Sequence, residues 1–305
     1  LMAITANSFV SLVVIATEYR TSFTLLEFQF QGQIYSLSSI LSLLTAAVII
    51  SVIRKCLDIK NWEGIADSIY VAHRENPKID TRKGLGSTFA SLVVISGGGS
   101  VGQYGPLVHF GSTIGLFIKN FFNLKMSPDI FIGCGVAAAI AAGFNAPLAG
   151  ILFAHEAILR HFSLRAIAPI SIASFSASAF GEYFFGNAPA LFELSQQVPP
   201  LNEVLPILIL LGPAFAIITV CFMIALRAAN NFASMNERHK IFLPFIAALI
   251  CGSVGVFLPE IMGLGIGAIN DLIAGNISLT KVSMLLIAKI SMTALCIGFG
   301  LFGGI

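Results

Sequence analysis

The amino-acid sequence predicts an all-α integral membrane protein made of helices that are repeatedly interrupted. Of its 305 residues, 56% are hydrophobic and only 10% are charged, and the mean hydropathy is +0.90. A soluble domain needs more charges than this to cover its surface. From residue 84 onward, the apolar segments differ in length and are broken by Gly, Pro or Asn. Short, broken helices in both halves of a membrane protein indicate a transport site near the middle of the bilayer, often built from inverted repeats.

Hydropathy and helix-breaking residues place the individual membrane segments. Residues 2–17 are the remainder of one helix, residues 18–33 form a polar loop, and residues 34–53 supply the roughly 20 residues that cross about 30 Å of hydrocarbon. A basic connection follows, with a short amphipathic piece at 64–72. The later apolar segments are 85–96, 105–122, 129–143, 146–159, 165–186, 203–229, 241–258 and 282–303, with a Gly-rich piece at 262–275.

The charges indicate orientation and exclude one class of partner. The net charge of +2 is too small to indicate nucleic-acid binding. Seven of the 17 Lys and Arg residues fall between positions 54 and 83, and the positive-inside tendency places that connection in the cytoplasm. A plasma or inner membrane is the expected residence. The five cysteines are widely spaced and predict neither a disulfide framework nor a metal site; no cofactor is expected.

The stretch from Gly97 to Gly111 interrupts an apolar run with glycines and then restarts it as a helix. Pro106 suits the first turn of a helix, which therefore begins at about Gly105. The first backbone N–H groups of such a helix lack partners, and its dipole puts partial positive charge at the same end, so this end attracts anions. At membrane depth, irregular backbone is tolerated only around a cavity or inside protein. An anion pathway is one interpretation; a glycine-rich turn packed between helices is the other.

Residues 143–153 form a second break of the same kind. Asn145 can cap a helix, and Pro147 lies in the first turn of the segment that follows. Small residues at 137–149 also favour close helix packing, and this alternative is compatible with a site.

Both breaks resemble signature motifs of a known family. Gly102-Gln-Tyr-Gly-Pro-Leu-Val-His-Phe-Gly111 resembles the Gly-Lys/Arg-Glu-Gly-Pro motif of the CLC chloride channels and chloride/proton exchangers. Ala142-Gly-Phe-Asn-Ala-Pro-Leu-Ala-Gly-Ile-Leu-Phe-Ala-His-Glu156 resembles that family's longest signature. The terminal Gly303-Gly304-Ile305 is similar to the beginning of a third signature, Gly-Gly-Ile-Phe-x-Pro. Both ends look cut, so residues 1–305 are expected to be a fragment of one transmembrane domain, with the first half at about 1–195 and an incomplete second half at about 196–305.

The resemblance implies a homodimer in which each subunit carries its own anion pathway, formed by a CLC-type bundle of tilted, broken helices arranged as two inverted halves. Backbone N–H groups of Gln103 and Gly105 would bind an outer anion, and Ile305 would contribute from the other half. The remaining expected pore positions are Glu63, Gly64, Ile65, Gly102, Tyr104 and Pro106.

Two departures from the family's pattern bear on proton coupling. Tyr104 occupies the position where a glutamate usually competes with anions and carries a proton. A phenol ordinarily titrates near pH ~10, so Tyr104 is a gate candidate that blocks as a neutral ring. Ala157 occupies the position of the exchangers' inner proton-transfer glutamate. Glu156 beside it is interpreted as a structural carboxylate held by neighbouring N–H groups, with proton transfer as the alternative.

Glu63 is the third departure. Counting back from Tyr104 without gaps aligns Trp62-Glu63-Gly64-Ile65-Ala66 with the family's Gly-Ser-Gly-Ile-Pro, which puts Glu63 where a serine usually touches the central anion. An ionised carboxylate there repels chloride by several kcal/mol at intermediate dielectric. The group is therefore protonated or paired, or it turns away, or the loop is out of register, or it is a solvated acid at a cytoplasmic mouth. His109, about one turn after Tyr104, is a secondary candidate for gating or pH sensing, with a structural hydrogen-bonded role as the alternative.

These observations predict transport of a chloride-like anion, passive because the two usual proton-carrying glutamates are replaced at Tyr104 and Ala157. One alternative is an anion/proton antiporter, or a transporter of another substrate, that uses Glu63. A second is a non-conducting homologue. An enzyme built on His109, His155 and Glu156 is not favoured, since nothing in the sequence brings these groups together with a nucleophile or a metal.

Overall fold

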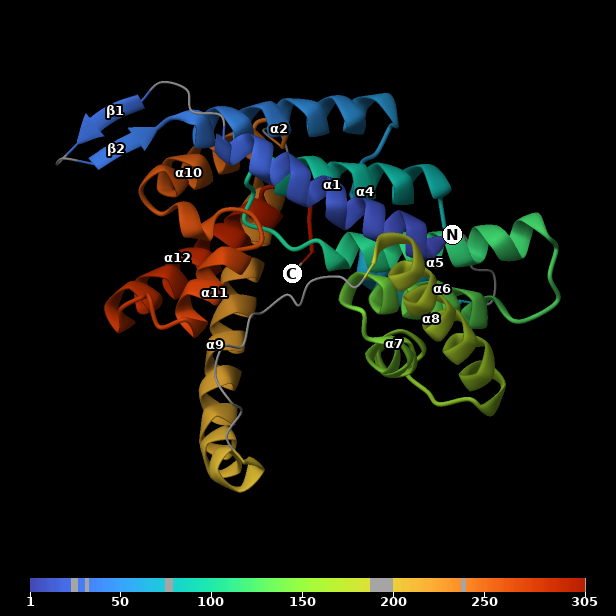
Figure 1. Cartoon of the computed structure of the whole chain (residues 1–305). Coiled ribbons are helices and arrows are strands. Elements are labelled where there is room, and N and C mark those ends of the chain that lie inside the picture. The colour runs from blue at the N-terminus through green and yellow to red at the C-terminus, as the bar shows by residue number, and fades with distance from the viewer. Residues whose placement is uncertain (23–26, 31–32, 75–78, 187–199, 237–239, 305) are drawn as a thin grey trace.

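The computed structural model describes residues 1–22, 27–30, 33–74, 79–186, 200–236 and 240–304. These residues form a bundle of helices with one small β-hairpin (Figure 1). The helices are α1 (Met2–Ser22), α2 (Ser38–Cys56), α3 (Ile65–Ala72), α4 (Thr81–Ser96), α5 (Tyr104–Phe121), α6 (Pro128–Phe144), α7 (Pro147–Phe153), the π-helical η1 (Ala154–Leu159), α8 (Leu164–Phe185), α9 (Leu201–Met235), α10 (Leu243–Phe257), the short 3-10 helix η3 (Pro259–Ile261), α11 (Ile266–Ile273) and α12 (Leu279–Gly298). The strands are β1 (Glu27–Phe30) and β2 (Gln33–Ser36).

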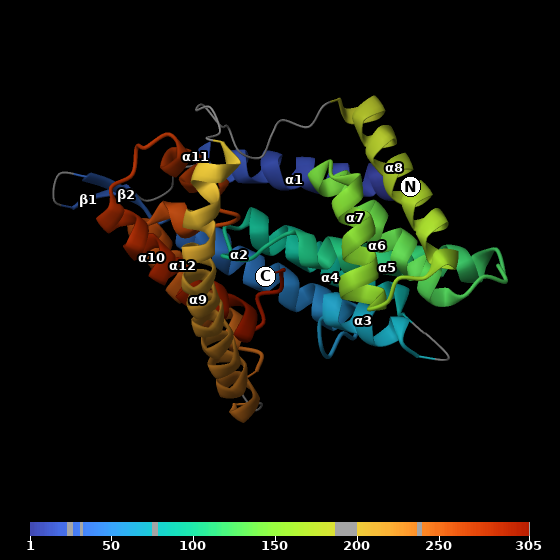
Figure 2. The same ribbon diagram turned by 90° about the horizontal axis from the view of Figure 1, so that it is seen from below.

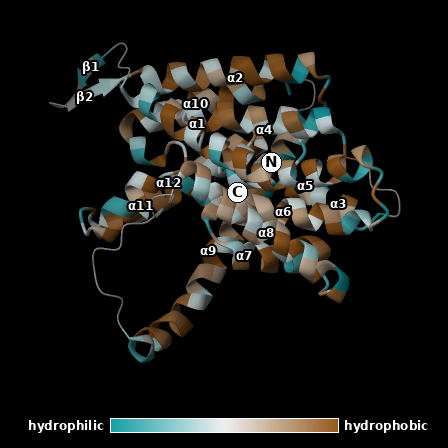
Figure 3. Ribbon diagram, turned by 45° about the vertical axis from the view of Figure 1, so that its right-hand side comes forward, coloured by the Kyte–Doolittle hydropathy of each residue, from teal (hydrophilic) through white to brown (hydrophobic). Residues whose placement is uncertain are grey.

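The prediction of interrupted helices of unequal length is confirmed. Within the described ranges, five helices are long and apolar enough to cross a membrane: α1, α2, α8, α12 and Asn202–Met235 of α9. The segments 128–144, 147–159 and 243–257 are apolar but shorter. Figure 3 shows hydrophobic residues along the outer faces of α2 and α9, where lipid rather than water is the suitable neighbour. The chain is an integral membrane protein.

The polar stretch 18–33 differs from the predicted loop. α1 continues to Ser22, and β1 pairs with β2 in antiparallel register, with Glu27 opposite Ser36. Because residues 33–36 are extended, the second span begins at Ser38 rather than at residue 34. The boundary between the two halves predicted near residue 195 falls outside the described residues.

Close packing of α6 against its neighbours depends on small residues. A Cβ at Gly111 or Gly115 of α5 would meet backbone oxygens of α6, at Gly135 and Phe131. A Cβ at Gly150 of α7 would lie 2.6 Å from the carbonyl oxygen of Ala137. The backbones of α5, α6 and α7 therefore touch without intervening side chains, as the small-residue pattern predicted.

The C-terminal part of the described chain packs against the first helices and returns to the middle of the molecule. α9 projects from the bundle and packs against α12 (Figures 1 and 2). α10 packs against α2. After α12 ends at Gly298, residues 299–304 return to the centre of the molecule (Figure 2). This return brings the second half of the chain to the glycine-rich break of the first.

Candidate functional site

The glycine-rich break is a sharp turn between α4 and α5. Gly98 has φ +95°, a left-handed conformation that favours glycine. α5 begins at Tyr104, one residue from the predicted start, with Pro106 in its first turn. The start of this helix therefore lies inside the protein, immediately after irregular backbone.

The second half of the chain meets this turn through main-chain atoms. The Gly102 N–H donates to the Gly304 carbonyl oxygen at 2.7 Å, and the Gly304 N–H donates to the Gly102 carbonyl oxygen at 2.6 Å. A Cβ at Gly105 would lie 2.8 Å from the Gly304 Cα, so neither position has room for a side chain. Ile305, the residue expected to contribute from this half, lies outside the described residues.

A third segment, at the start of α3, joins the same place. The Ile65 Cδ1 atom lies 3.8 Å from the position that a Cβ of Gly105 would occupy. The Phe302 Cζ atom lies 4.0 Å from the position that a Cβ of Gly64 would occupy. The rings of Trp62 and Phe302 have centroids 5.7 Å apart. Three distant parts of the sequence therefore converge here. We call this site the junction, and it consists of residues 62–65, 102–105 and 302–304.

Several N–H groups at the junction already have partners. Gly102 donates to Gly304, the Gly64 N–H donates to the Asp67 Oδ2 at 2.8 Å, and the Glu63 N–H donates to the Ser87 Oγ at 3.0 Å. In contrast, the N–H groups of Gln103, Tyr104 and Gly105 form no hydrogen bond with the described residues. Three consecutive unpaired donors at a helix start, together with the helix dipole, favour an anion.

The Tyr104 side chain is held by the second predicted break, at the end of α6. Its ring stacks on Phe144, with centroids 3.6 Å apart, and its hydroxyl donates to the Gly143 carbonyl oxygen at 3.1 Å. A Cβ at Gly143 would lie 2.8 Å from the Tyr104 Cε1, so only glycine admits the ring in this position. Both sequence breaks therefore contribute to one structure.

Glu63 is paired rather than freely solvated. Its carboxylate lies 3.6 Å from the Lys83 Nζ and 3.5 Å from the His109 Nε2, and its side chain is 21% exposed. His109 is fully buried, and its Nδ1 lies 2.8 Å from the Ser68 Oγ. Of the interpretations left open by the sequence, pairing of Glu63 matches the geometry.

The candidates around residue 156 lie elsewhere and are not joined to this cluster. Glu156 is exposed and forms no hydrogen bond or ion pair with the described residues, so the expected bonds from neighbouring N–H groups are not found there. The His155 Nδ1 contacts the Ile151 carbonyl oxygen at 2.9 Å, and its ring stacks on Phe162. Ala157, in the same π-helical segment, carries no ionisable group.

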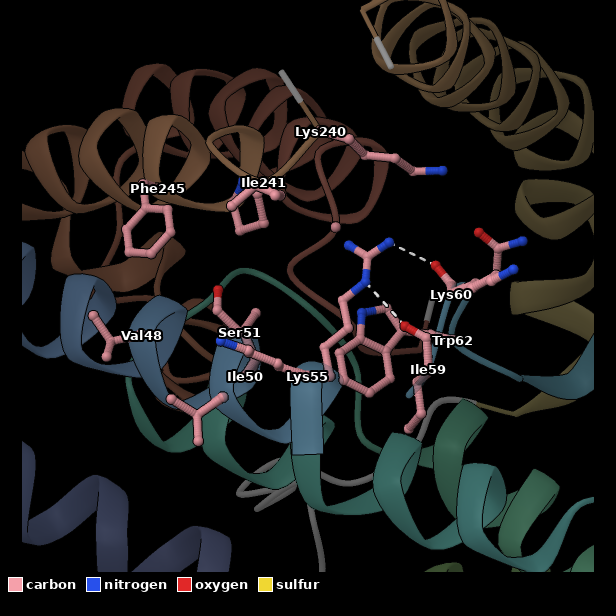
Figure 4. Close-up of a pocket in the computed structure, with 15 residues that line it drawn as sticks. Val48, Ile50, Ser51, Lys55, Ile59, Lys60, Trp62, Lys240, Ile241 and Phe245 are labelled. Atoms are coloured by element: carbon pink, nitrogen blue, oxygen red, sulfur yellow. Dashed lines mark hydrogen bonds between the residues drawn. The ribbon is translucent and has the colours of Figure 1, made fainter. Parts of the chain in front are cut away.

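A basic cavity of about 850 Å³ lies against the junction (Figure 4). Its cations are Arg54, Lys55, Lys60 and Lys240, its apolar lining includes Ile241 and Phe245, and the described residues lining it include no acid. Arg54 donates to the Ile59 and Lys60 carbonyl oxygens at 3.1 and 2.6 Å, which fixes the loop leading to Trp62. Since Trp62 lines the cavity and belongs to the junction, the cavity places positive charge beside the junction, which favours negatively charged ligands there.

The role of some residues in this region could not have been predicted from the sequence. Ser68, Lys83 and Lys240 join the site only through tertiary contacts, and no local pattern marks them. Lys289 does carry a signal, because a lysine inside the apolar segment 282–303 is unusual. Its amine donates to the Ile261 and Gly263 carbonyl oxygens at 2.8 and 2.6 Å. It thereby braces the loop whose Gly263 N–H donates to the Gly98 carbonyl oxygen.

Comparison with solved structures gives the fold. A CLC-type fluoride/proton antiporter matches with a TM-score of 0.80 and 22% identity, covering 100% of this chain and 74% of that one. A slow cyanobacterial Cl-/H+ antiporter matches with a TM-score of 0.80 and 18% identity, covering 99% and 72%. At these identities the likeness establishes a shared architecture.

Sequence relatives give the family. The H(+)/Cl(-) exchange transporter ClcA of Vibrio parahaemolyticus is 29% identical over 225 residues, which are 71% of this chain and 48% of that protein. ClcA of Yersinia pestis is 32% identical over 232 residues, 73% of this chain and 46% of that protein. The chain thus spans about half the length of these curated relatives. Residues 41–305 match the family described as voltage gated chloride channel. The chain therefore belongs to the voltage-gated chloride channel, or CLC, family.

Proposed function

We propose that this chain forms the anion pathway of a membrane transporter for chloride or a similar inorganic anion. The observation that carries the proposal is the row of three N–H groups at the start of α5 that have no hydrogen-bond partner in the described part of the chain and lie opposite Gly304. Such donors bind a negative ion without needing a positively charged side chain. The basic cavity beside Trp62 supplies the approach to this site.

We further propose that transport is passive. Tyr104 and Ala157 stand where exchangers of the family are expected to have proton-carrying glutamates, and neither side chain exchanges protons near neutral pH. The test is anion efflux from proteoliposomes that contain the full chain, recorded together with the external pH. Efflux without proton uptake supports the proposal. Proton pumping in fixed ratio to an imposed anion gradient refutes passivity while leaving anion transport intact.

Exchange with protons is the second candidate, and two observations favour it. The relatives are named H(+)/Cl(-) exchange transporters, and a titratable group, Glu63, is present at the junction beside His109. In this case Glu63→Gln abolishes proton movement but leaves anion flux. Glu203→Gln, at an exposed site at the start of α9, is the matched control and should change neither. Unchanged coupling in Glu63→Gln excludes this candidate.

The remaining assignments follow from the family resemblance, from the distribution of basic residues and from the contacts of the candidate side chains. We propose a homodimer in a plasma or inner membrane, with residues 54–83 on the cytoplasmic side and no organic cofactor or metal. We propose transport rather than catalysis, because no contact among the described residues joins His109, His155 and Glu156. A non-conducting homologue is the further alternative, and flux through Tyr104→Ala distinguishes it.

A further inference from the structure

His109 is a buried histidine with one unused ring nitrogen. Its side chain is 0% exposed. The Nδ1 is hydrogen-bonded to the Ser68 hydroxyl at 2.8 Å, whereas the Nε2 has no hydrogen-bond partner among the described residues and lies 3.5 Å from the Glu63 carboxylate. A buried polar atom without a partner is unfavourable in a folded protein, so its position beside a carboxylate suggests a function.

The charged groups around this pair come from three segments. The loop before α3 supplies Glu63, and α3 itself supplies Asp67, whose carboxylate is occupied by the Gly64 N–H. α4 supplies Lys83, 3.6 Å from Glu63. The helices α6 and α1 also pack against α5. The ionisable residues of these two helices are Asp129 and Cys134 on α6 and Glu18, Tyr19 and Arg20 on α1. In the described part of the chain, none of them forms a hydrogen bond or ion pair with His109.

We propose that Ser68, His109 and Glu63 form a proton-binding site that controls access of anions to the junction. In the protonated state both ring nitrogens carry a proton, so the Nδ1–H donates to the Ser68 Oγ and the Nε2–H faces the Glu63 carboxylate. The additional proton is taken from water when the pH falls and is returned to water when the pH rises. The charge of the His109 and Glu63 pair changes from −1 to 0 when it binds and returns to −1 when it leaves.

The sign of the effect follows from where Glu63 lies. It is part of the junction, next to Gly64 and to Ile65, whose side chain approaches Gly105, so its negative charge opposes anions that approach the start of α5. Histidine is the side chain whose charge ordinarily changes between about pH 5 and 8. Anion flux therefore rises as the pH falls through this range. This inference rests on the proposed anion transport, and it places the proton at a position where the family's usual glutamates play no part.

The experiment measures chloride efflux from proteoliposomes of the full chain at pH 5.5 and pH 8. Removing one unit of repelling charge is expected to raise flux by about tenfold. His109→Gln cannot take the proton and should stay at the low flux at both pH values. Glu63→Gln should stay at the high flux at both. His73→Gln, at an exposed histidine on the end of α3, is the matched control and should keep the dependence of the wild type.

An independent measurement separates this inference from the proposed function. The imidazole carbon resonances of histidine, followed by NMR in detergent, should show the His109 resonance moving between the two pH values used for flux, and moving differently in Glu63→Gln. Movement of the resonance supports the proton site even if none of the variants conducts. A lack of conduction in every variant would refute the proposed anion transport but not the proton site. The inference is overturned if His109→Gln keeps the wild-type dependence of flux on pH, or if the His109 resonance does not move. Size-exclusion chromatography shows which variants are folded, and His109→Asn replaces His109→Gln if the latter aggregates.

Discussion

Removing the Tyr104 side chain tests whether the junction is a gated pathway. The ring is held by a stacking contact with Phe144 and by a hydrogen bond to the Gly143 carbonyl oxygen. An aromatic pair contributes about 1 kcal/mol beyond its buried area, and a neutral hydrogen bond contributes about 1 kcal/mol. If this position closes the pathway, the closed state is stabilised by about 2 kcal/mol, and Tyr104→Ala should raise passive flux about 30-fold, because each 1.4 kcal/mol is a factor of ten.

Two partial variants make the prediction graded. Tyr104→Phe keeps the ring and loses the hydrogen bond, so its flux should rise about fivefold. Phe144→Ala removes the stacking partner without changing the junction and should give a rise of similar size. Flux is measured as chloride efflux with an ion-selective electrode, and thermal unfolding shows that each variant is folded. Equal flux in the wild type and Tyr104→Ala refutes the gate, and equal flux in Tyr104→Phe and Tyr104→Ala refutes the division of energy between the two contacts.

Three further changes test other parts of the structure. In Gly304→Ala the new Cβ would lie 2.7 Å from the Gly105 amide nitrogen, so the free energy of unfolding should fall by about 2–4 kcal/mol. The control Gly267→Ala has open space around the new Cβ and should change the melting temperature little. Lys240→Gln removes one cation of the basic cavity and should lower flux about twofold at low ionic strength, with no difference in about 0.5 M impermeant salt; a deficit that persists in salt contradicts the electrostatic role. Burial raises the pKa of Glu260, but the hydrogen bond to Lys281, a backbone hydrogen bond and the charge of Lys281 together lower it by more, so the net pKa is below its ordinary value. This pair should add about 0.5 kcal/mol of stability at pH 7 that is lost as the pH falls through the lowered pKa, and in Glu260→Gln the melting temperature should not show this acid-dependent component.

Local signals in the sequence were sufficient for the helices that surround the site. Glycine and proline at 97–106 predicted the start of α5 to within one residue. Glycine tolerates the left-handed conformation of the turn, and proline suits the first turn of a helix, where its missing N–H needs no partner. The small hairpin was missed, although Glu27–Phe30 alternates polar and apolar residues as a strand does. It lies in a short polar stretch, where hydropathy suggests only a loop.

The contents of the site were less predictable. Tyr104 and Glu63 were identified because each replaces an expected residue type in a recognisable motif. Lys83 and Ser68 were not, since their contacts with Glu63 and His109 join positions 20 and 41 residues apart in the chain. No local pattern records which residues of α3, α4 and α5 face one another. The pairing of Glu63 was therefore one of several open interpretations until the helices were placed.

The link between Gly102 and Gly304 has a consequence for how such a protein diversifies. The four atoms that join the two segments belong to the peptide backbone, and glycine at both positions contributes no chemical identity of its own. Replacing the neighbouring side chains at 103 or 104 leaves this join intact. Substitutions at these two positions can thus alter the chemistry offered to a ligand without removing the hydrogen bonds that hold residues 102 and 304 together.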